Sequence, residues 1–322
     1  MSTLQSWKWH YRITLTMVLL TNCLPGCVAP PPASPVASPT LPLASATSYT
    51  TATLIPVPTT PTPLSTPTPT HTPTRPPVTP RPPFTADEKF SFAREMLGTN
   101  AGCELPCWWG ITPGETKWEM VPEIFGVYGI TGHLYRNTTL SYGFDPPRGE
   151  RRYYYNLVFH LTHQEGLVHS IRIQSQVLGD LKTNRFPQDW QRYALHQVLS
   201  RYGQPSQVML EFWPNPPGPY YPYSLLVFYD HQGILIRYGG SAIPGEPFRM
   251  CPKLEEIDYL NLWLRPPGEG PSLLELADLD RAELAQMLPL EEATGMGIQT
   301  FYETFREADA TVCLESPVEV WP

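Results

Sequence analysis

Two stretches of the chain share an alternating pattern of apolar and polar residues, interrupted by a turn that contains glycine. They run over 157–173 and 225–238, and both turn at His-Gln-(Glu)-Gly. Alternation with a period of two is typical of strands that bury one face, and glycine between two such runs predicts a hairpin. A run with helical spacing that ends in Tyr-Gly precedes each hairpin, at 124–129 and 198–203. The pattern therefore predicts two units, each a helix followed by an antiparallel meander.

The register of the first hairpin follows from its apolar positions. Leu157, Phe159 and Leu161 form one face of the first strand. We expect Leu157 to pair with Ile173 and Phe159 with Ile171, which leaves 164–166 as a three-residue loop with glycine last.

Both predicted helices have a recognisable boundary. Thr112-Pro113-Gly114-Glu115 offers a cap, a proline for the first helical position and a capping-box glutamate, so it predicts a helix start. The second helix ends at Tyr202-Gly203-Gln204-Pro205, and the first at Tyr128-Gly129-Ile130-Thr131, which lacks the proline. A helix, this turn and a meander resemble the repeats of the β-lactamase-inhibitor-protein family and of related small outer-membrane lipoproteins. The resemblance covers about 112–240 and implies a module that presents a sheet face or loops to another protein; it carries over no catalytic residues.

The C-terminal part, 246–322, adds a strand and short helices. Residues 255–264 alternate but are apolar on both faces, which predicts a strand covered on both sides. Capping-box patterns at 272–275 and 280–283 predict two short helices, and 298–307 a further one. The predicted fold class of the globular part, 84–322, is α+β: an antiparallel sheet from two tandem helix–meander repeats (112–175 and 186–240), with the C-terminal strand and helices packed on it.

Composition separates this globular part from the first 83 residues. Between residues 28 and 83 there are 18 prolines in 56 residues, and most of the rest are Thr, Ser or Ala. Such a segment cannot bury enough apolar surface to offset the entropy of ordering it. We expect a disordered tether over 28–83.

The N-terminus carries an export signal over 1–27. Lys8 and Arg12 precede a short apolar run at 13–20, which is too short for a comfortable transmembrane helix. The following Leu24-Pro25-Gly26-Cys27 resembles the lipobox of bacterial lipoproteins, which implies that Cys27 is lipidated and becomes the first mature residue; Pro25 departs from the usual residue there. The alternative is an ordinary secretory signal with incidental cysteines. The lipoprotein reading predicts an extracytoplasmic chain, lipid-anchored to the cell membrane.

The charge of the globular part argues against nucleic acid as a partner. The chain has 22 Lys and Arg against 30 Asp and Glu, and four of the basic residues lie before residue 84. The remainder has 22 − 4 = 18 basic and 30 acidic side chains, a net charge of −12. An acidic domain repels phosphate backbones.

The cysteines that remain after processing are even in number, which in an exported chain predicts disulfides. They are Cys103, Cys107, Cys251 and Cys313. Of the three possible connectivities we favour Cys103–Cys107 as a local loop and Cys251–Cys313 as a long-range link. The C-x₃-C spacing is not the C-x₂-C of redox and zinc motifs. His160, His163 and His169 do not converge in the predicted register, so we expect no metal site, and no cofactor motif is present.

No catalytic motif stands out, so the sequence favours a non-enzymatic binding module for a protein or an envelope polymer. Aromatic residues in loops are the candidate contacts, since they suit stacking on sugars or gripping a partner; the other reading of the two tryptophans is burial in the core. The alternative function is an envelope hydrolase that uses histidine or a pair of C-terminal carboxylates. The candidate contacts are Trp108, Trp109, Tyr220, Tyr221 and Tyr223, and the carboxylates are Glu275, Asp278, Asp280, Glu283, Glu291 and Glu292.

Overall fold

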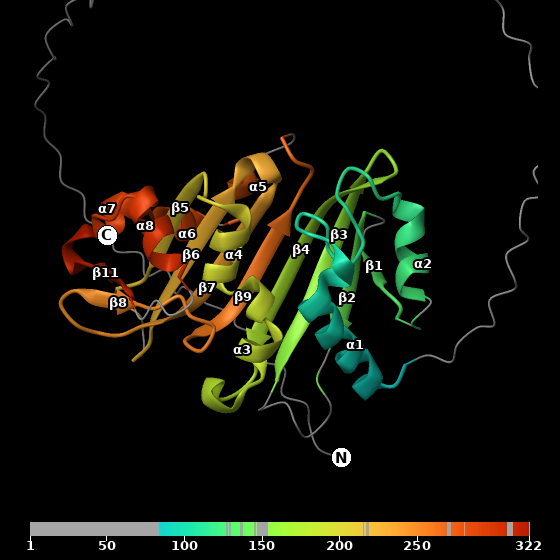
Figure 1. Ribbon diagram of the computed structural model, residues 1–322, viewed down its shortest axis with the longest axis horizontal. Coiled ribbons are helices and arrows are strands. Elements are labelled where there is room, and N and C mark those ends of the chain that lie inside the picture. Colours follow the sequence, from blue (N-terminus) through green and yellow to red (C-terminus); the bar gives the residue numbers. More distant parts are fainter. Residues whose placement is uncertain are drawn as a thin grey trace, which may run out of the picture. The chain divides into compact units, whose positions relative to one another are not determined.

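The computed structural model describes residues 84–126, 128, 130–135, 138–144, 146, 154–214, 216, 219–268, 272–279, 281–307 and 312–321. The predicted export signal, the tether and Cys27 lie outside these residues. The central element is a nine-stranded antiparallel sheet in the order β1-β2-β3-β4-β9-β7-β6-β5-β10 (Figure 1). Helices accompany the sheet, so the predicted α+β class with a large antiparallel sheet is confirmed.

The strands of the large sheet are β1 His133–Tyr135, β2 Thr139–Phe144, β3 Tyr155–Gln164, β4 Leu167–Val177, β5 Gln207–Phe212, β6 Tyr221–Tyr229, β7 Ile234–Ala242, β9 Ile257–Leu264 and β10 Met287–Pro289. Two further strands, β8 Phe248–Met250 and β11 Leu314–Ser316, form a separate two-stranded sheet.

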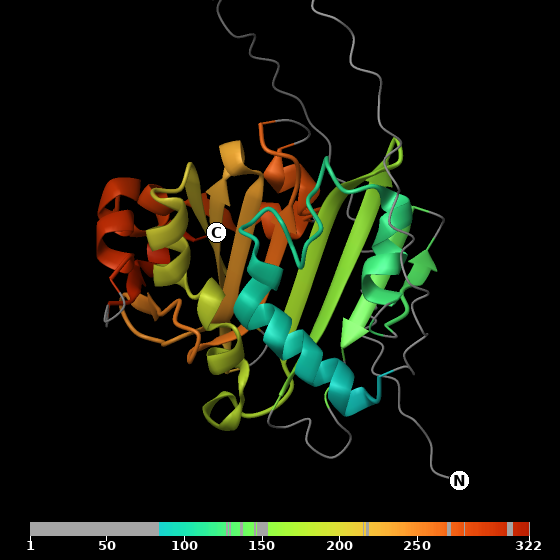
Figure 2. The same ribbon diagram turned by 45° about the vertical axis from the view of Figure 1, so that its right-hand side comes forward.

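The helices divide between the two faces of the large sheet. α1 and α4 lie on the same face, where they cover the main apolar core (Figure 2). α5 contributes to a smaller apolar cluster on the opposite face, against β6, β7 and β9. The helices are α1 Ala86–Thr99, α2 Val121–Gly126, α3 Phe186–Asp189, α4 Leu195–Tyr202, α5 Leu273–Leu276, α6 Arg281–Ala285, α7 Leu290–Thr294 and α8 Ile298–Phe305. Among the described residues, none of the helices combines the length and the apolar character needed to span a bilayer.

The helix predicted at Thr112 begins later. Gly114 has a φ of +82°, which a right-handed helix cannot contain. The chain therefore turns at 112–116, and helical structure starts with a short 3-10 turn, Trp118–Met120, that leads into α2.

The register predicted for the first hairpin is wrong by two residues. Phe159 pairs with Ile173 and Leu161 with Ile171. The shift conserves the buried face, because a register change of two residues returns every side chain to the same side of the sheet. The apolar pattern alone could not distinguish these registers.

A two-residue turn and a bulge cause this shift. Glu165 and Gly166 have φ values of +53° and +79°, as a type I′ turn requires. Consecutive residues of β3 then pair with Val168 and Ser170, which leaves His169 as an extra residue in β4. Val168 is fully buried, whereas His169 is partly exposed.

β9 lies in the middle of the sheet instead of packing on it, which corrects the predicted place of the C-terminal strand. It is antiparallel to β4 on one side and to β7 on the other, so that Leu264 is flanked by Ile171 and Ile234. Leu264 faces the main core, while Trp263 belongs to the smaller cluster on the opposite face. β9 is therefore covered on both faces, as predicted, because each face packs against one of the two apolar clusters.

The two three-stranded meanders approach β9 from opposite sides. β2–β3–β4 ends beside β9 at one edge, and β5–β6–β7 ends beside it at the other. Because β4 and β7 are both antiparallel to β9, they run parallel to each other, and both meanders turn the same face to the main core. The order of the strands is thus mirrored about β9. A rotation that placed β2, β3 and β4 onto β5, β6 and β7 in chain order would turn the core-facing side of the first meander away from the core.

Two disulfides, as predicted, link Cys103 to Cys107 and Cys251 to Cys313. The second joins the end of β8 to the residue before β11, the two strands that pair with each other. The first closes a small loop around the buried side chain of Asn100. This amide donates to the carbonyl oxygens of Cys103 and Cys107, each at 2.9 Å.

Candidate ligand-binding groove

The structure removes three of the five aromatic candidates from the surface. Trp108, Trp109 and Tyr223 are 0%, 1% and 2% exposed, so they cannot contact a ligand. Tyr221 is partly buried and packs against Phe248 with ring centroids 5.1 Å apart. Tyr220, 72% exposed, is the one of the five that stands free on the surface.

The paired tryptophans are buried because the backbone turns between them. Trp109 has a φ of +53°, and both rings enter the core that the helices close over the sheet. The Trp108 ring stacks on Trp109 with centroids 5.2 Å apart and lies 5.7 Å from Tyr193. The reading of both residues as core is therefore the correct one.

Two of the carboxylates considered for hydrolysis have structural partners. Glu275 closes a capping box with Ser272 at the start of α5. Glu283 forms an ion pair with Arg237 at 3.1 Å. Asp280 lies outside the described residues. Within the described ranges, no group of three or more His, Cys, Asp or Glu side chains is arranged to hold a metal ion.

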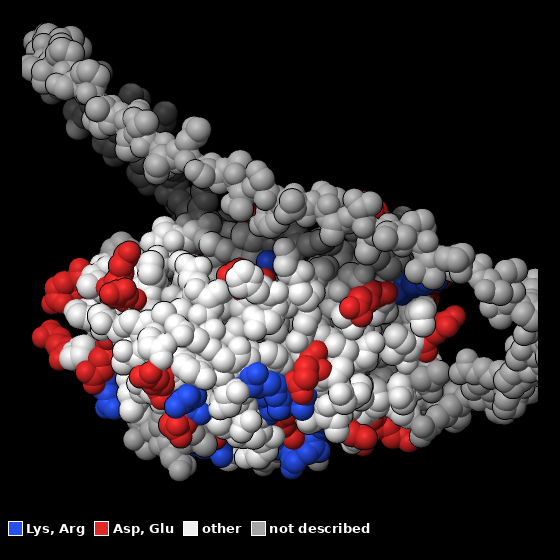
Figure 3. Space-filling view, turned by 45° about the horizontal axis from the view of Figure 1, so that its top comes forward, with Lys and Arg blue, Asp and Glu red and all other residues white. Residues whose placement is uncertain are grey.

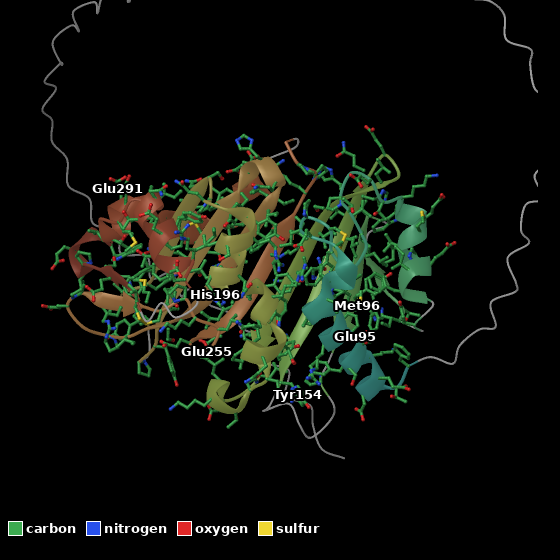
Figure 4. The ribbon with its side chains drawn as sticks, in the orientation of Figure 1. Glu95, Met96, Tyr154, His196, Glu255 and Glu291 are labelled. Atoms are coloured by element: carbon green, nitrogen blue, oxygen red, sulfur yellow. A yellow bond between two sulfur atoms is a disulfide. The ribbon has the colours of Figure 1, made fainter. Side chains whose placement is uncertain are left out.

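A groove of about 530 Å³ lies on the sheet face opposite the main core, over β3, β4, β9 and β7. We call it the open groove. Figure 4 shows the core side of the sheet for comparison, with Met96 on α1 and His196 on α4. The open groove is lined by Asn156, Val158, His160, Arg172, Gln174, Ser175, Gln176, Arg237, Tyr259 and Asn261.

Strand pairing arranges the lining in rows across the sheet. In one row Val158, Gln174, Asn261 and Arg237 lie on four neighbouring strands. His160 and Arg172 pair in the next row, and Asn156 and Gln176 in another, beside Tyr259. Because side chains two apart on a strand share a face, these rows form one continuous and mainly polar surface.

One end of the groove is built around the buried side chain of Arg237. Its guanidinium binds Glu211 and Glu283 and lies 5.6 Å from the centre of the Tyr259 ring. Burial acts to lower the pKa of Arg237, but Tyr259 and the two glutamates outweigh it and raise that pKa. This end is therefore a closed ionic network, in which both glutamates are occupied by the arginine.

Arg172, which lines the groove beside His160, has different surroundings from Arg237. It stacks on the ring of Trp263 at 5.5 Å, and its Nε is buried without a hydrogen-bond partner. Among the described residues it forms no ion pair within 4.0 Å. Burial lowers its pKa, which the more distant Asp278 opposes. The groove thus holds a guanidinium that forms no ion pair with a carboxylate of the described part of the chain.

His160 sits beside this arginine on β3. Burial is the main cause that lowers its pKa, and the charge of Arg172 acts in the same direction. A hydrogen bond with Gln174 opposes both. The imidazole is therefore neutral at neutral pH and can both donate and accept hydrogen bonds.

Sequence reasoning missed the open groove because its residues come from four strands. The signal that could have found it is the polar face of 156–160 and 172–176, which alternates with the apolar face that was recognised. Locating the groove also required β9 between β4 and β7.

From one side of the molecule, acidic side chains gather at the end formed by α7 and α8, which includes Glu291 and Glu292 (Figure 3).

Comparison with known proteins gives this chain no relative from which to transfer a role: no family model, no curated protein and no solved structure matches it.

Proposed function

We propose that this chain is a non-enzymatic, membrane-anchored lipoprotein outside the cytoplasm, which binds a protein or envelope polymer through the open groove. The observation that supports binding is a groove of about 530 Å³ with hydrogen-bonding side chains from four strands. This volume falls in the range of sites for small ligands or single polymer units. Polar lining on a rigid sheet favours a ligand that forms many hydrogen bonds.

The anchoring part of the proposal rests on the N-terminal sequence. Lipid at Cys27 and the proline-rich segment 28–83 would hold the globular domain at a distance from the membrane. A segment of 56 residues spans about 170 Å when extended and about 40 Å as a coil. Metabolic labelling with a fatty-acid analogue tests this: the wild-type chain is expected to incorporate label in the membrane fraction, and Cys27→Ser to be unlabelled and released. Equal labelling of both would refute the anchor.

In this proposal the two helix–meander units act as supports for one shared face. Each unit keeps a helix layer on the core side, and both border β9, which carries part of the groove. The sequence pattern shared by 157–173 and 225–238 then reflects the same strand–turn–strand arrangement. The binding residues are concentrated on β3, β4 and β9.

The hydrolase alternative has less support from the geometry. Glu211 and Glu283 both bind Arg237, which lines the groove, and are held in that ion-pair network. The arrangement suits structural stabilisation of the groove wall.

Filling the groove tests the binding proposal. Val158 is half-buried in the lining, and Val158→Trp would occupy the space without removing a hydrogen bond. Purified full-length protein is mixed with an insoluble cell-envelope fraction and sedimented. We expect the wild-type chain to co-sediment and Val158→Trp to stay in solution.

The control for this variant is Thr139→Trp. Thr139 pairs with Thr162 on the same sheet face but does not line the groove. It is expected to co-sediment like the wild-type chain. Equal co-sedimentation of Val158→Trp would contradict binding at the groove.

A further inference from the structure

We propose that the open groove recognises an acidic sugar unit, a ring with several hydroxyls and a single carboxylate, and that Arg172 binds the carboxylate. This inference rests on the proposed binding role and specifies the ligand. The structural basis is the position of Arg172 in the lining, where it pairs with His160 on β3 and with Trp263 on β9.

The need for a negative charge follows from the surroundings of Arg172. Stacking on Trp263 fixes the plane of the guanidinium, and its Nε is already turned into the protein. Arg172 itself is part of the groove lining. A guanidinium in a fixed plane presents paired donors that match a carboxylate, and it is pre-organised for that contact.

The charged groups around Arg172 favour a ligand that carries a single negative charge. Asp278 and Glu283 act on Arg172 from the α5–α6 side of the groove, and Arg237 is paired with Glu211 and Glu283. The whole globular part has a net charge of −12, as derived above. A ligand with many phosphates or carboxylates would be repelled by this field, whereas one carboxylate gains more from Arg172 than it loses.

The amide side chains of the groove lining favour a ligand that carries several hydroxyl groups. Asn156, Gln174, Gln176 and Asn261 lie in adjacent positions on β3, β4 and β9. Each amide offers both donors and acceptors, and neutral His160 does the same. Hydroxyl groups, which also donate and accept, are the chemical complement of such a surface. An apolar ligand would leave these groups without partners.

The probe is sodium glucuronate, and glucose is the matched neutral sugar. Both are titrated into the full-length protein in detergent micelles by isothermal calorimetry. We expect glucuronate to bind with a Kd of about 1 mM, the order set by a ligand of this size. We expect glucose to bind at least about tenfold more weakly. Acetate carries the carboxylate without hydroxyls and is also expected to bind at least about tenfold more weakly.

Two variants assign the carboxylate to Arg172. Arg172→Gln removes the charge, and Gln174→Glu introduces a near-isosteric carboxylate next to it; both are expected to weaken glucuronate binding at least about tenfold. Arg306→Gln is the matched control, because Arg306 also stacks on an aromatic ring, that of Tyr302 at 5.3 Å, outside the groove. This control is expected to bind glucuronate like the wild type. Far- and near-ultraviolet circular dichroism establishes that each variant is folded, and Gln174→Glu provides the test if Arg172→Gln is not.

The outcomes separate this inference from the proposed function. Equal binding of glucose and glucuronate, no binding of glucuronate, or unchanged binding by the variants would overturn the acidic-sugar proposal. Acetate binding as tightly as glucuronate would also overturn it, by showing that the hydroxyls contribute nothing. Co-sedimentation that is lost in Val158→Trp would still support the groove as a binding site in each of these cases. Glucuronate binding that needs Arg172, with co-sedimentation unaffected by Val158→Trp, would support the sugar site and refute the envelope role.

Discussion

The ring of Tyr259 lies across the backbone of Gly239, on the neighbouring strand β7. A Cβ atom placed on Gly239 would come within 2.0 Å of Cζ of the tyrosine ring. The ring therefore lies flat on the sheet, and its hydroxyl reaches Ser224 on β6, with the two oxygens 2.7 Å apart. This contact closes one end of the open groove and places the ring beside Arg237.

Gly239→Ala is expected to destabilise the protein by about 1–3 kcal/mol, because the added methyl group forces the half-buried ring of Tyr259 out of its position. Urea unfolding followed by tryptophan fluorescence measures the change. Gly143→Ala on β2 is the control, since its Cβ would come no closer than 4.0 Å to Val158. We expect it to change stability by less than about 0.5 kcal/mol.

The same contact predicts strong coupling between the two positions. In a Gly239→Ala/Tyr259→Ala double variant the methyl group no longer meets a ring, so the second substitution should cost less than it does alone. We expect a coupling energy of at least about 1 kcal/mol. Additive losses would show that the tyrosine ring does not depend on the space above Gly239.

Arg237→Met is expected to cost about 3–5 kcal/mol of unfolding free energy. The substitution leaves Glu211, 3% exposed, as a buried carboxylate without its partner. Arg249→Met is the control: its ion pair with Glu315 spans 3.8 Å and is exposed, so we expect a change below about 1 kcal/mol. If chemical denaturation gave both variants the same small loss, the network would not stabilise the groove wall.

Loss of the two disulfides is expected to differ in cost because of the length of chain that each closes. Cys251 and Cys313 are 62 residues apart, and Cys103 and Cys107 are four apart. The chain-entropy relation predicts losses of about 4 kcal/mol and about 2 kcal/mol for the respective double serine variants. Urea denaturation of both variants under identical conditions measures the difference. The reverse order would show that local packing around the loop at 103–107 dominates over chain entropy.

The stability of the domain is expected to fall on acidification, in part through His160. Its pKa is lower in the folded state than the value of about 6.5 of an unfolded chain, chiefly because of burial and then Arg172. The unfolded chain therefore binds the proton more tightly than the folded chain. The contribution of neutral His160 to the free energy of unfolding is complete above about pH 6.5 and is lost as the pH falls through the folded pKa.

Replacement of His160 by glutamine tests this dependence. Unfolding free energy is measured for both proteins between pH 7.5 and pH 5, on the order of one unit either side of the unfolded pKa. The pH slope of the variant should be smaller than that of the wild type. Gln174→Met removes the hydrogen bond that raises the pKa of His160, so imidazole titration followed by NMR should show a lower pKa in this variant. A pKa that stays constant or rises there would contradict the geometry of this pair.

Local patterns predicted the elements that depend on neighbouring residues. The alternation at 225–238 predicted β6 and β7, and the capping box at 272–275 predicted the start of α5, which the structure shows. The helix start at Thr112 failed because Gly114 has a positive φ and its N–H donates to the carbonyl oxygen of Val168, which is distant in sequence. The register error at Phe159 came from a bulge that leaves the apolar pattern unchanged.

The groove lay beyond sequence reasoning for the same reason. Arg172 and Asn261 are separated by almost 90 residues and meet only because β9 enters between β4 and β7. Aromatic composition drew attention to Trp108 and Trp109, yet the space between helices and sheet requires large apolar side chains, and the core takes both. Polar side chains on the outer face of the same strands carry the candidate site.

The central claim is that the partner sits on the outer face of β3, β4 and β9. Hydroxyl-radical footprinting of the full-length chain, with and without a soluble envelope extract, tests it without any substitution. We predict reduced oxidation of Val158 and His160, and unchanged oxidation of Tyr220 and Met120, which are 72% and 46% exposed away from the groove. Protection of Tyr220 or Met120, with Val158 and His160 oxidised as before, would contradict the account.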